Sequence, residues 1–284
     1  MLLQKSGESK IMDFKFGNLQ KHVTQLHKSL ERLPKRPPPK DVHQLRRQIR
    51  SLEAIMNALT AGRVRHLLKA LILVRKAAGK VRDMDVLVEL ACSLSTARNA
   101  ECLVQLLEYL GGRRVKAAAK LQAIISAQRK EALRSLKRCS RLIEKGRTSS
   151  KKTTSTNQKL PLNTVVLVRS LSAELSNCPR INKDNLHSYR LKIKELHYIL
   201  QLVTDGDRKV IAALGEAKDA IGGWHDWNEL ATITKRVLGH GPTCGVLKQV
   251  QLISREKLKR AISAANEMRK KSFRENTFAE NGRK

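Results

Sequence analysis

One arginine-rich stretch, between Val42 and Leu52, has the spacing of a helix that can bind phosphate. Its basic side chains are His43, Arg46, Arg47 and Arg50. At about 100° per residue they share one sector of about 100°, and the opposite side is apolar and can join a core. Arginine presents a planar fork of N–H donors that suits phosphate oxygens, and successive helical turns place such groups about 5 Å apart. This row of donors can follow a chain of phosphates.

The same pattern returns about 144 residues later, between Leu186 and Leu196. His187 matches His43, Arg190 matches Arg46, and Lys194 matches Arg50. Leu191 stands at the position of Arg47, so the second copy is less basic there. A basic face that served only solubility would have no reason to keep the same three offsets, so we interpret the face as a binding surface.

A second block repeats with an offset of 143, between residues 77–87 and 220–230. The pairs are Gly79 with Gly222, Arg82 with His225, Asp83 with Asp226, and Asp85 with Asn228; at the same offset Arg75 pairs with Lys218. Two linked blocks indicate an internal duplication of about 140 residues, which is too long for a solenoid repeat. Asp83 and Asp226 are interpreted as helix N-caps, and Arg82 and His225 as candidates beside an anion site.

The composition indicates an aliphatic helical protein with a polyanionic partner. The 284 residues include 57 Lys and Arg against 25 Asp and Glu, a formal net charge of +32. This excess opposes compaction by self-repulsion and concentrates anions, so the expected partner is nucleic acid, an acidic membrane or a phosphate polymer. Apolar residues make up 41% and aromatic residues 3%, which favours helix packing over a β-rich fold.

Five scattered cysteines argue against a zinc site or a disulfide framework and fit a reducing compartment. Neither a membrane-spanning stretch nor an apolar signal core is expected. We therefore expect a soluble intracellular protein without metal or cofactor, located in the cytoplasm, on polyphosphate granules, or in a nucleus where one exists.

Periodicity predicts an all-α chain in two half-domains. Gly79 is expected to end one helix, Asp83 to begin the next, and Gly111-Gly112 to separate two more. The Ser/Thr/Lys-rich segment 146–161 is expected to be a flexible linker between a first helical repeat, residues 13–145, and a second, residues 162–271. The expected helices are 13–33, 42–60, 63–78, 83–95, 101–110, 115–144, 163–176, 184–203, 207–221, 227–238 and 244–271.

A binding protein is favoured over an enzyme. The sequence contains no GxxxxGK[ST] loop and no closely alternating acidic run, and its carboxylates are scattered. Binding of single-stranded nucleic acid usually uses aromatic platforms, and two Trp, three Tyr and four Phe supply few of them. Nonspecific binding of an RNA or DNA backbone remains the alternative, and docking of acidic proteins is a third.

The two blocks resemble the CHAD family, the conserved histidine α-helical domain, over about residues 13–270. The resemblance implies two four-helix bundles about a pseudo-two-fold axis, with a basic central groove between them that binds inorganic polyphosphate. By position, it implies that the groove is lined by His43, Arg46, Arg47, Arg50, Arg82, His187, Arg190, Lys194 and His225. Arg75 and Lys218 are added from the repeat alignment. Some members carry a triphosphate-tunnel enzyme domain, whose acidic motif is lacking here.

Overall fold

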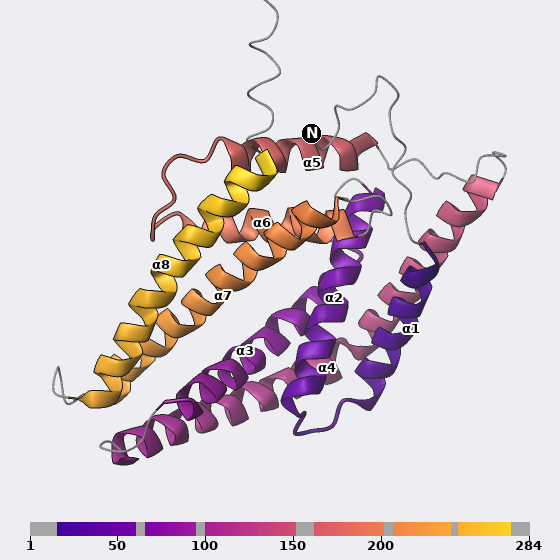
Figure 1. The fold of residues 1–284 in the computed structure, drawn as a ribbon. Coiled ribbons are helices and arrows are strands. Elements are labelled where there is room, and N and C mark those ends of the chain that lie inside the picture. The colour runs from indigo at the N-terminus through magenta and orange to yellow at the C-terminus, as the bar shows by residue number, and fades with distance from the viewer. Residues whose placement is uncertain are drawn as a thin grey trace, which may run out of the picture.

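The structure, a computed structural model, is built from helices throughout the part that it describes: residues 16–60, 66–94, 100–151, 162–201, 207–239 and 244–273. Within these ranges there are eight helices and no strand (Figure 1). The prediction of an all-α chain is confirmed. The helices are α1 (Phe16–Arg32), α2 (Pro39–Thr60), α3 (Lys69–Cys92), α4 (Ala100–Lys151), α5 (Leu162–Ser176), α6 (Leu186–Gln201), α7 (Arg208–Val237) and α8 (Gly245–Phe273).

Prolines set the corner between α1 and α2. The helix α1 ends at Arg32, two residues before the first proline of the run, because proline cannot continue a helix. Pro39 begins α2, where its missing N–H group costs nothing. The backbone N–H of Asp41 donates to the carbonyl of Pro38 over 3.1 Å, and the Asp41 carboxylate lies in the first turn.

The predicted breaks at Gly79 and at its repeat partner Gly222 are wrong. Both α3 and α7 run through these glycines without interruption, so Asp83 and Asp226 lie inside helices and are not N-caps. A glycine inside a helix costs only about 1 kcal/mol, which tertiary packing can offset. The true cap of α7 is Asp207, whose carboxylate accepts from the backbone N–H groups of residues 209 and 210 over 2.8 and 3.3 Å.

The predicted break at Gly111-Gly112 is also wrong, because α4 continues through both residues and reaches Lys151. An added Cβ at either glycine would meet nothing within 4 Å, so helix geometry and not close packing is the only demand at this point. The end of α4 overlaps the first part of the predicted linker 146–161. Residues 152–161 lie outside the described residues.

Three apolar cores hold the helices together. The first lies among α1 to α4 and includes Leu26, Ile49 and Leu121; the second lies among α5 to α8 and includes Ile193 and Leu214. The third joins the two halves, where the adjoining ends of α3 and α4 pack against α7 and α8 (Figure 1). The buried members of this shared core include Leu87, Leu106, Trp227, Leu230 and Val250. Because this core fixes one half against the other, α2 and α6 are also held in contact.

Candidate functional site

The two histidine helices separate apolar from basic side chains as their sequence period requires. On α2, Leu45 and Ile49 are fully buried, while Arg46 and Arg50 are partly buried and His43 is exposed. On α6, Ile193 and Leu196 are fully buried in the second core. Burial of the apolar sides fixes the rotation of each helix about its axis. It therefore also fixes the direction of the basic sides.

Two glycines give the arginines room. The Nε atom of Arg46 would lie 3.5 Å from a Cβ added at Gly79. In the second half, the Nη2 atom of Arg190 would lie 2.7 Å from a Cβ added at Gly222. An arginine thus lies beside a glycine in both halves, but only at Gly222 is the approach too close for a Cβ; at Gly79 an added Cβ would make an ordinary van der Waals contact. The Nε atom of Arg190 is buried and has no hydrogen-bond partner among the described residues.

Cations from both halves act on one another at this site. Lys194 is the clearest case: burial, together with the positive charges of Arg50, Arg190 and Arg46, lowers the pKa of its amine to about 7. Arg50 and Arg46 belong to α2 and Lys194 belongs to α6, so the effect crosses from one half to the other. Since Lys218 on α7 also lowers the pKa of Lys194, the cluster draws on three helices.

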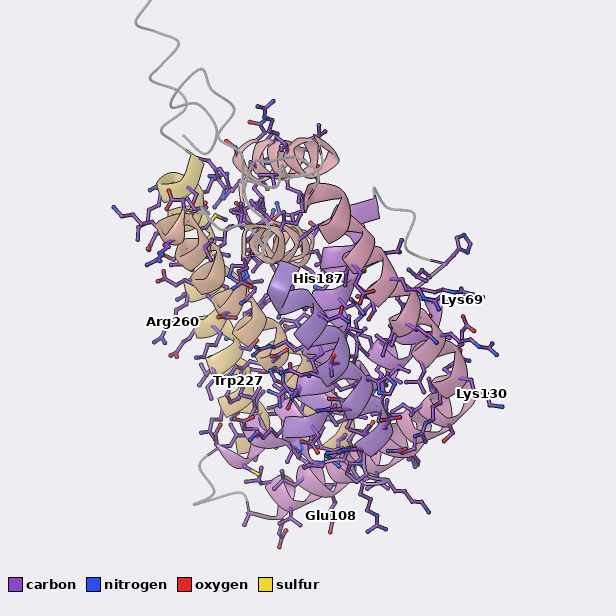
Figure 2. The ribbon with its side chains drawn as sticks, turned by 90° about the vertical axis from the view of Figure 1, so that its right-hand side faces the viewer. Lys69, Glu108, Lys130, His187, Trp227 and Arg260 are labelled. Carbon is purple, nitrogen blue, oxygen red and sulfur yellow. The ribbon has the colours of Figure 1, made fainter. Side chains whose placement is uncertain are left out.

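His43 and His187 lie at the edges of this cluster and are disfavoured as cations. Burial, followed by the charge of Arg82, lowers the pKa of His43. Burial also lowers the pKa of His187, whose ring centroid lies 5.5 Å from that of His225. In Figure 2, His187 lies near the middle of the view. All the predicted site residues therefore lie in, or border, one basic region, and their role in ligand binding stays a prediction.

Several carboxylates partly neutralise the positive charge of the cluster, and the sequence analysis did not assign them to the site. The ion pair between Arg75 and Glu53 spans 2.8 Å, and Lys218 pairs with Asp219 over 3.3 Å. The two cations added from the repeat alignment thus already have partners. Asp83, interpreted from the sequence as a cap, instead faces the cluster: desolvation raises the pKa of its carboxyl, while Arg46 opposes that shift.

A cavity of about 670 Å³ opens beside the cluster, between α1, α2, α6 and α7. His43, Arg47 and Lys218 line it, together with Lys40 and several amides. Its wall also contains His197, which the sequence analysis interprets as incidental, and Tyr198, which it does not single out. His197 is 6% exposed, its Nδ1 has no partner among the described residues, and burial lowers its pKa. The spacing of His197 on α6, at the edge of the basic face, was the signal available.

The arrangement offers many donors and few acceptors, which suits an anionic ligand. In the described part of the chain, no group of three or more His, Cys, Asp or Glu side chains is placed to hold a metal ion. Nor does any helix in those ranges have the length and apolarity needed to cross a bilayer. The site is therefore defined by convergent cations from two halves of a helical fold.

That combination defines a class of helical proteins, and the comparisons give the family. The model of the CHAD domain matches residues 17–234, so the chain belongs to the CHAD family. A search of curated proteins found no match. Two solved structures share the fold: PptA from Streptomyces chartreusis, and the CHAD domain from the plant Ricinus communis. The first has 13% identity and a TM-score of 0.60, covering 91% of this chain and 97% of its own; the second has 15% and 0.54, covering 95% and 96%.

Neighbouring glycines on α7 provide a test of how Arg190 is positioned. We expect Gly222→Ala to displace the Arg190 guanidinium, because the new Cβ would lie 2.7 Å from its Nη2 atom, and to weaken binding of a phosphate polymer severalfold. Gly223→Ala is the matched control, since nothing lies within 4 Å of its added Cβ. Both substitutions should keep or raise the melting temperature, because alanine favours a helix over glycine by about 1 kcal/mol. Equal affinities of the two variants would contradict this placement of Arg190.

The pKa of Lys194 predicts that binding of a polyanion takes up protons. In the free protein Lys194 loses its proton as the pH rises through about 7. A bound anion favours the ammonium form and raises that pKa, so affinity should fall as the pH rises above 7 and should gain nothing more from this group well below 7. Calorimetry at pH 8, in buffers of different ionisation enthalpy, should find an uptake of up to about one proton that Lys194→Met removes.

The control for this experiment is Lys192→Met on the same helix. Lys192 pairs with Glu174 over 2.8 Å, away from the cluster. The uptake should survive in this variant. An unchanged uptake in Lys194→Met would mean that another group carries the proton.

Proposed function

We propose that this protein binds inorganic polyphosphate along the basic region formed by α2, α6, α3 and α7. The observation that carries the proposal is the convergence of Arg46, Arg50, Arg190 and Lys194 from two halves of the chain, where each cation disfavours the charge of the next. Such a cluster is unfavourable when empty. A bound polyanion would reduce the repulsion among these cations, and this reduction would contribute to the binding free energy.

The chemistry of the cluster favours a ligand made of phosphates alone. Guanidinium and ammonium groups only donate hydrogen bonds, and phosphate oxygens only accept them. Helical spacing repeats the donors about every 5 Å, so successive phosphates of one chain can meet successive turns. The family and the fold shared with PptA are consistent with such a ligand.

We further propose that the two halves are four-helix bundles related by an internal pseudo-two-fold duplication. The support is local: Arg46 lies over Gly79 as Arg190 lies over Gly222, at offsets of 144 and 143 residues. Under this proposal the ligand lies along the groove between the halves and contacts the same helix face twice. The second copy, with Leu191 in place of Arg47, contributes less.

We propose a binding role and not a catalytic one. The carboxylates nearest the cluster are engaged: Asp83 faces Arg46, and Asp226 lies 3.3 Å from the Nδ1 atom of His225. Their arrangement balances charge, and the donors around them would hold an anion by electrostatics and hydrogen bonds.

The direct test is the paired substitution of Arg46→Gln and Arg50→Gln. Each arginine lost should cost about 1 kcal/mol or more of binding free energy, so polyphosphate affinity should fall at least about tenfold, while helicity and melting temperature change little. The matched control is Arg255→Gln with Lys259→Gln, two exposed cations on α8. It removes the same charge and should alter polyphosphate affinity by less than about threefold.

Two outcomes of this test would refute the proposal. An equal loss of affinity in both double variants would show that net charge, and not the groove, holds the ligand. Unfolding of the Arg46/Arg50 variant would show that these arginines serve the fold.

A further inference from the structure

The cluster between the halves accounts for only part of the basic charge, and α4 carries a second concentration of it. Between residues 113 and 141 this helix contains ten Lys and Arg residues and one carboxylate, Glu131. Glu131 pairs with Arg134 over 3.5 Å. The stretch therefore keeps a large net positive charge, and its residues do not belong to the basic cluster between the halves.

Most of these cations lie on one side of α4. At about 100° per residue, eight of them fall within a sector of about 120°, and all eight are exposed. We call this set the α4 basic surface: Arg113, Lys116, Lys120, Lys130, Arg134, Lys137, Arg138 and Arg141. At 1.5 Å per residue it extends about 42 Å along a single helix.

The first helix adds a second wall to part of this surface. A groove of about 760 Å³ lies between α1 and α4, with Lys28 and Arg32 on the α1 side. Lys130, Arg134 and Lys137 form the α4 side. The carboxylate of Glu31 also lies in this wall, where it is 3.3 Å from the Nδ1 atom of His27. Cations thus face the groove from two helices.

The equivalent helix of the second half does not match this density. Glu256 and Glu267 are exposed on α8, and an exposed leucine, Leu252, lies between its cations. Over its 29 residues α8 carries eight Lys and Arg against two Glu, so the concentration of positive charge is higher on α4. A need for solubility would not single out one of the two helices.

The α4 basic surface is separate from the cluster between the halves. Lys130 projects from the outer right-hand edge of the molecule in Figure 2, whereas His187 lies near the middle of the view. The C-terminal part of α4 and the helix α1 lie on the side of α2 away from α7 and α8 (Figure 1). A ligand on this surface need not displace one in the groove.

We propose that the α4 basic surface binds the backbone of double-stranded nucleic acid without reading its sequence. A duplex is stiff on the scale of 42 Å and presents one negative charge per about 1.7 Å of its axis, which suits a long row of cations on one straight element. Single strands usually need aromatic platforms. The aromatic side chain of α4 between residues 100 and 144 is Tyr109, whose hydroxyl accepts hydrogen bonds from Arg113 and Arg236 over 3.2 and 2.8 Å.

Two triple variants test this proposal with equal loss of charge. The α4 variant carries Lys130→Gln, Lys137→Gln and Arg141→Gln. The control carries Lys248→Gln, Arg255→Gln and Lys259→Gln on α8, where the replaced side chains are also exposed. Each removes two lysines and one arginine, and circular dichroism checks that both variants fold. Fluorescence anisotropy then measures the affinity of the full chain for a short random-sequence duplex DNA at several salt concentrations.

The α4 variant should bind the duplex at least tenfold more weakly than the α8 control. If each lost cation contacts one phosphate, the slope of log affinity against log salt should become shallower by about 2.7. Polyphosphate affinity should change less than threefold in the α4 variant. An equal effect of both triple variants on duplex binding would overturn the proposal, as would no measurable duplex binding by the unmodified chain.

Duplex binding at the α4 basic surface does not depend on polyphosphate binding in the groove, so the two can be refuted separately. Arg46→Gln with Arg50→Gln should leave duplex affinity nearly unchanged while weakening polyphosphate binding. If that variant lost duplex binding as strongly as polyphosphate binding, one shared polyanion site would replace the two.

Discussion

Repulsion between cations on α2 and α6 is the constraint on which the rest of the structure depends. Arg50 stands close enough to Arg46, Arg190 and Lys194 to lower the pKa of each, and the pKa of Lys194 reaches about 7. Such a cluster is held together by the apolar sides of the same helices, where Leu45 and Ile193 are fully buried. Burial of apolar surface thus supplies free energy that charge repulsion partly consumes. A bound phosphate polymer would reduce this charge repulsion.

The shared core makes the convergence possible. Each half has a core of its own, but neither core alone would hold α2 against α6. Leu87 and Leu106 of the first half pack with Trp227 and Leu230 of the second, at a distance along α3 and α7 from the basic cluster. The packing of α3 and α4 against α7 and α8 therefore sets the separation of the histidine helices α2 and α6.

The sequence predicts the faces of the helices better than their ends. The period of Leu45, Ile49 and the basic positions between them places each side chain correctly, because burial follows the helical repeat. The predicted breaks at Gly79 and Gly222 were wrong because local helix propensity takes no account of tertiary contacts. At Gly222 the guanidinium of Arg190, 32 residues earlier in the chain, would lie 2.7 Å from an added Cβ. For the same reason Asp83 was interpreted as a cap and Tyr198 was not singled out. Their roles depend on how separate helices meet, which no local pattern reports.

The most direct measurement of the central claim is displacement of labelled long-chain polyphosphate by duplex DNA at about 150 mM salt, with competitor expressed as phosphate concentration. The groove, if shaped for a phosphate chain, should retain polyphosphate until duplex is in at least tenfold excess, a preference of about 1.4 kcal/mol. RNA and heparin should compete as weakly. Displacement of polyphosphate at equal phosphate concentration would contradict the account, because it would mean that the convergent cations hold any polyanion alike.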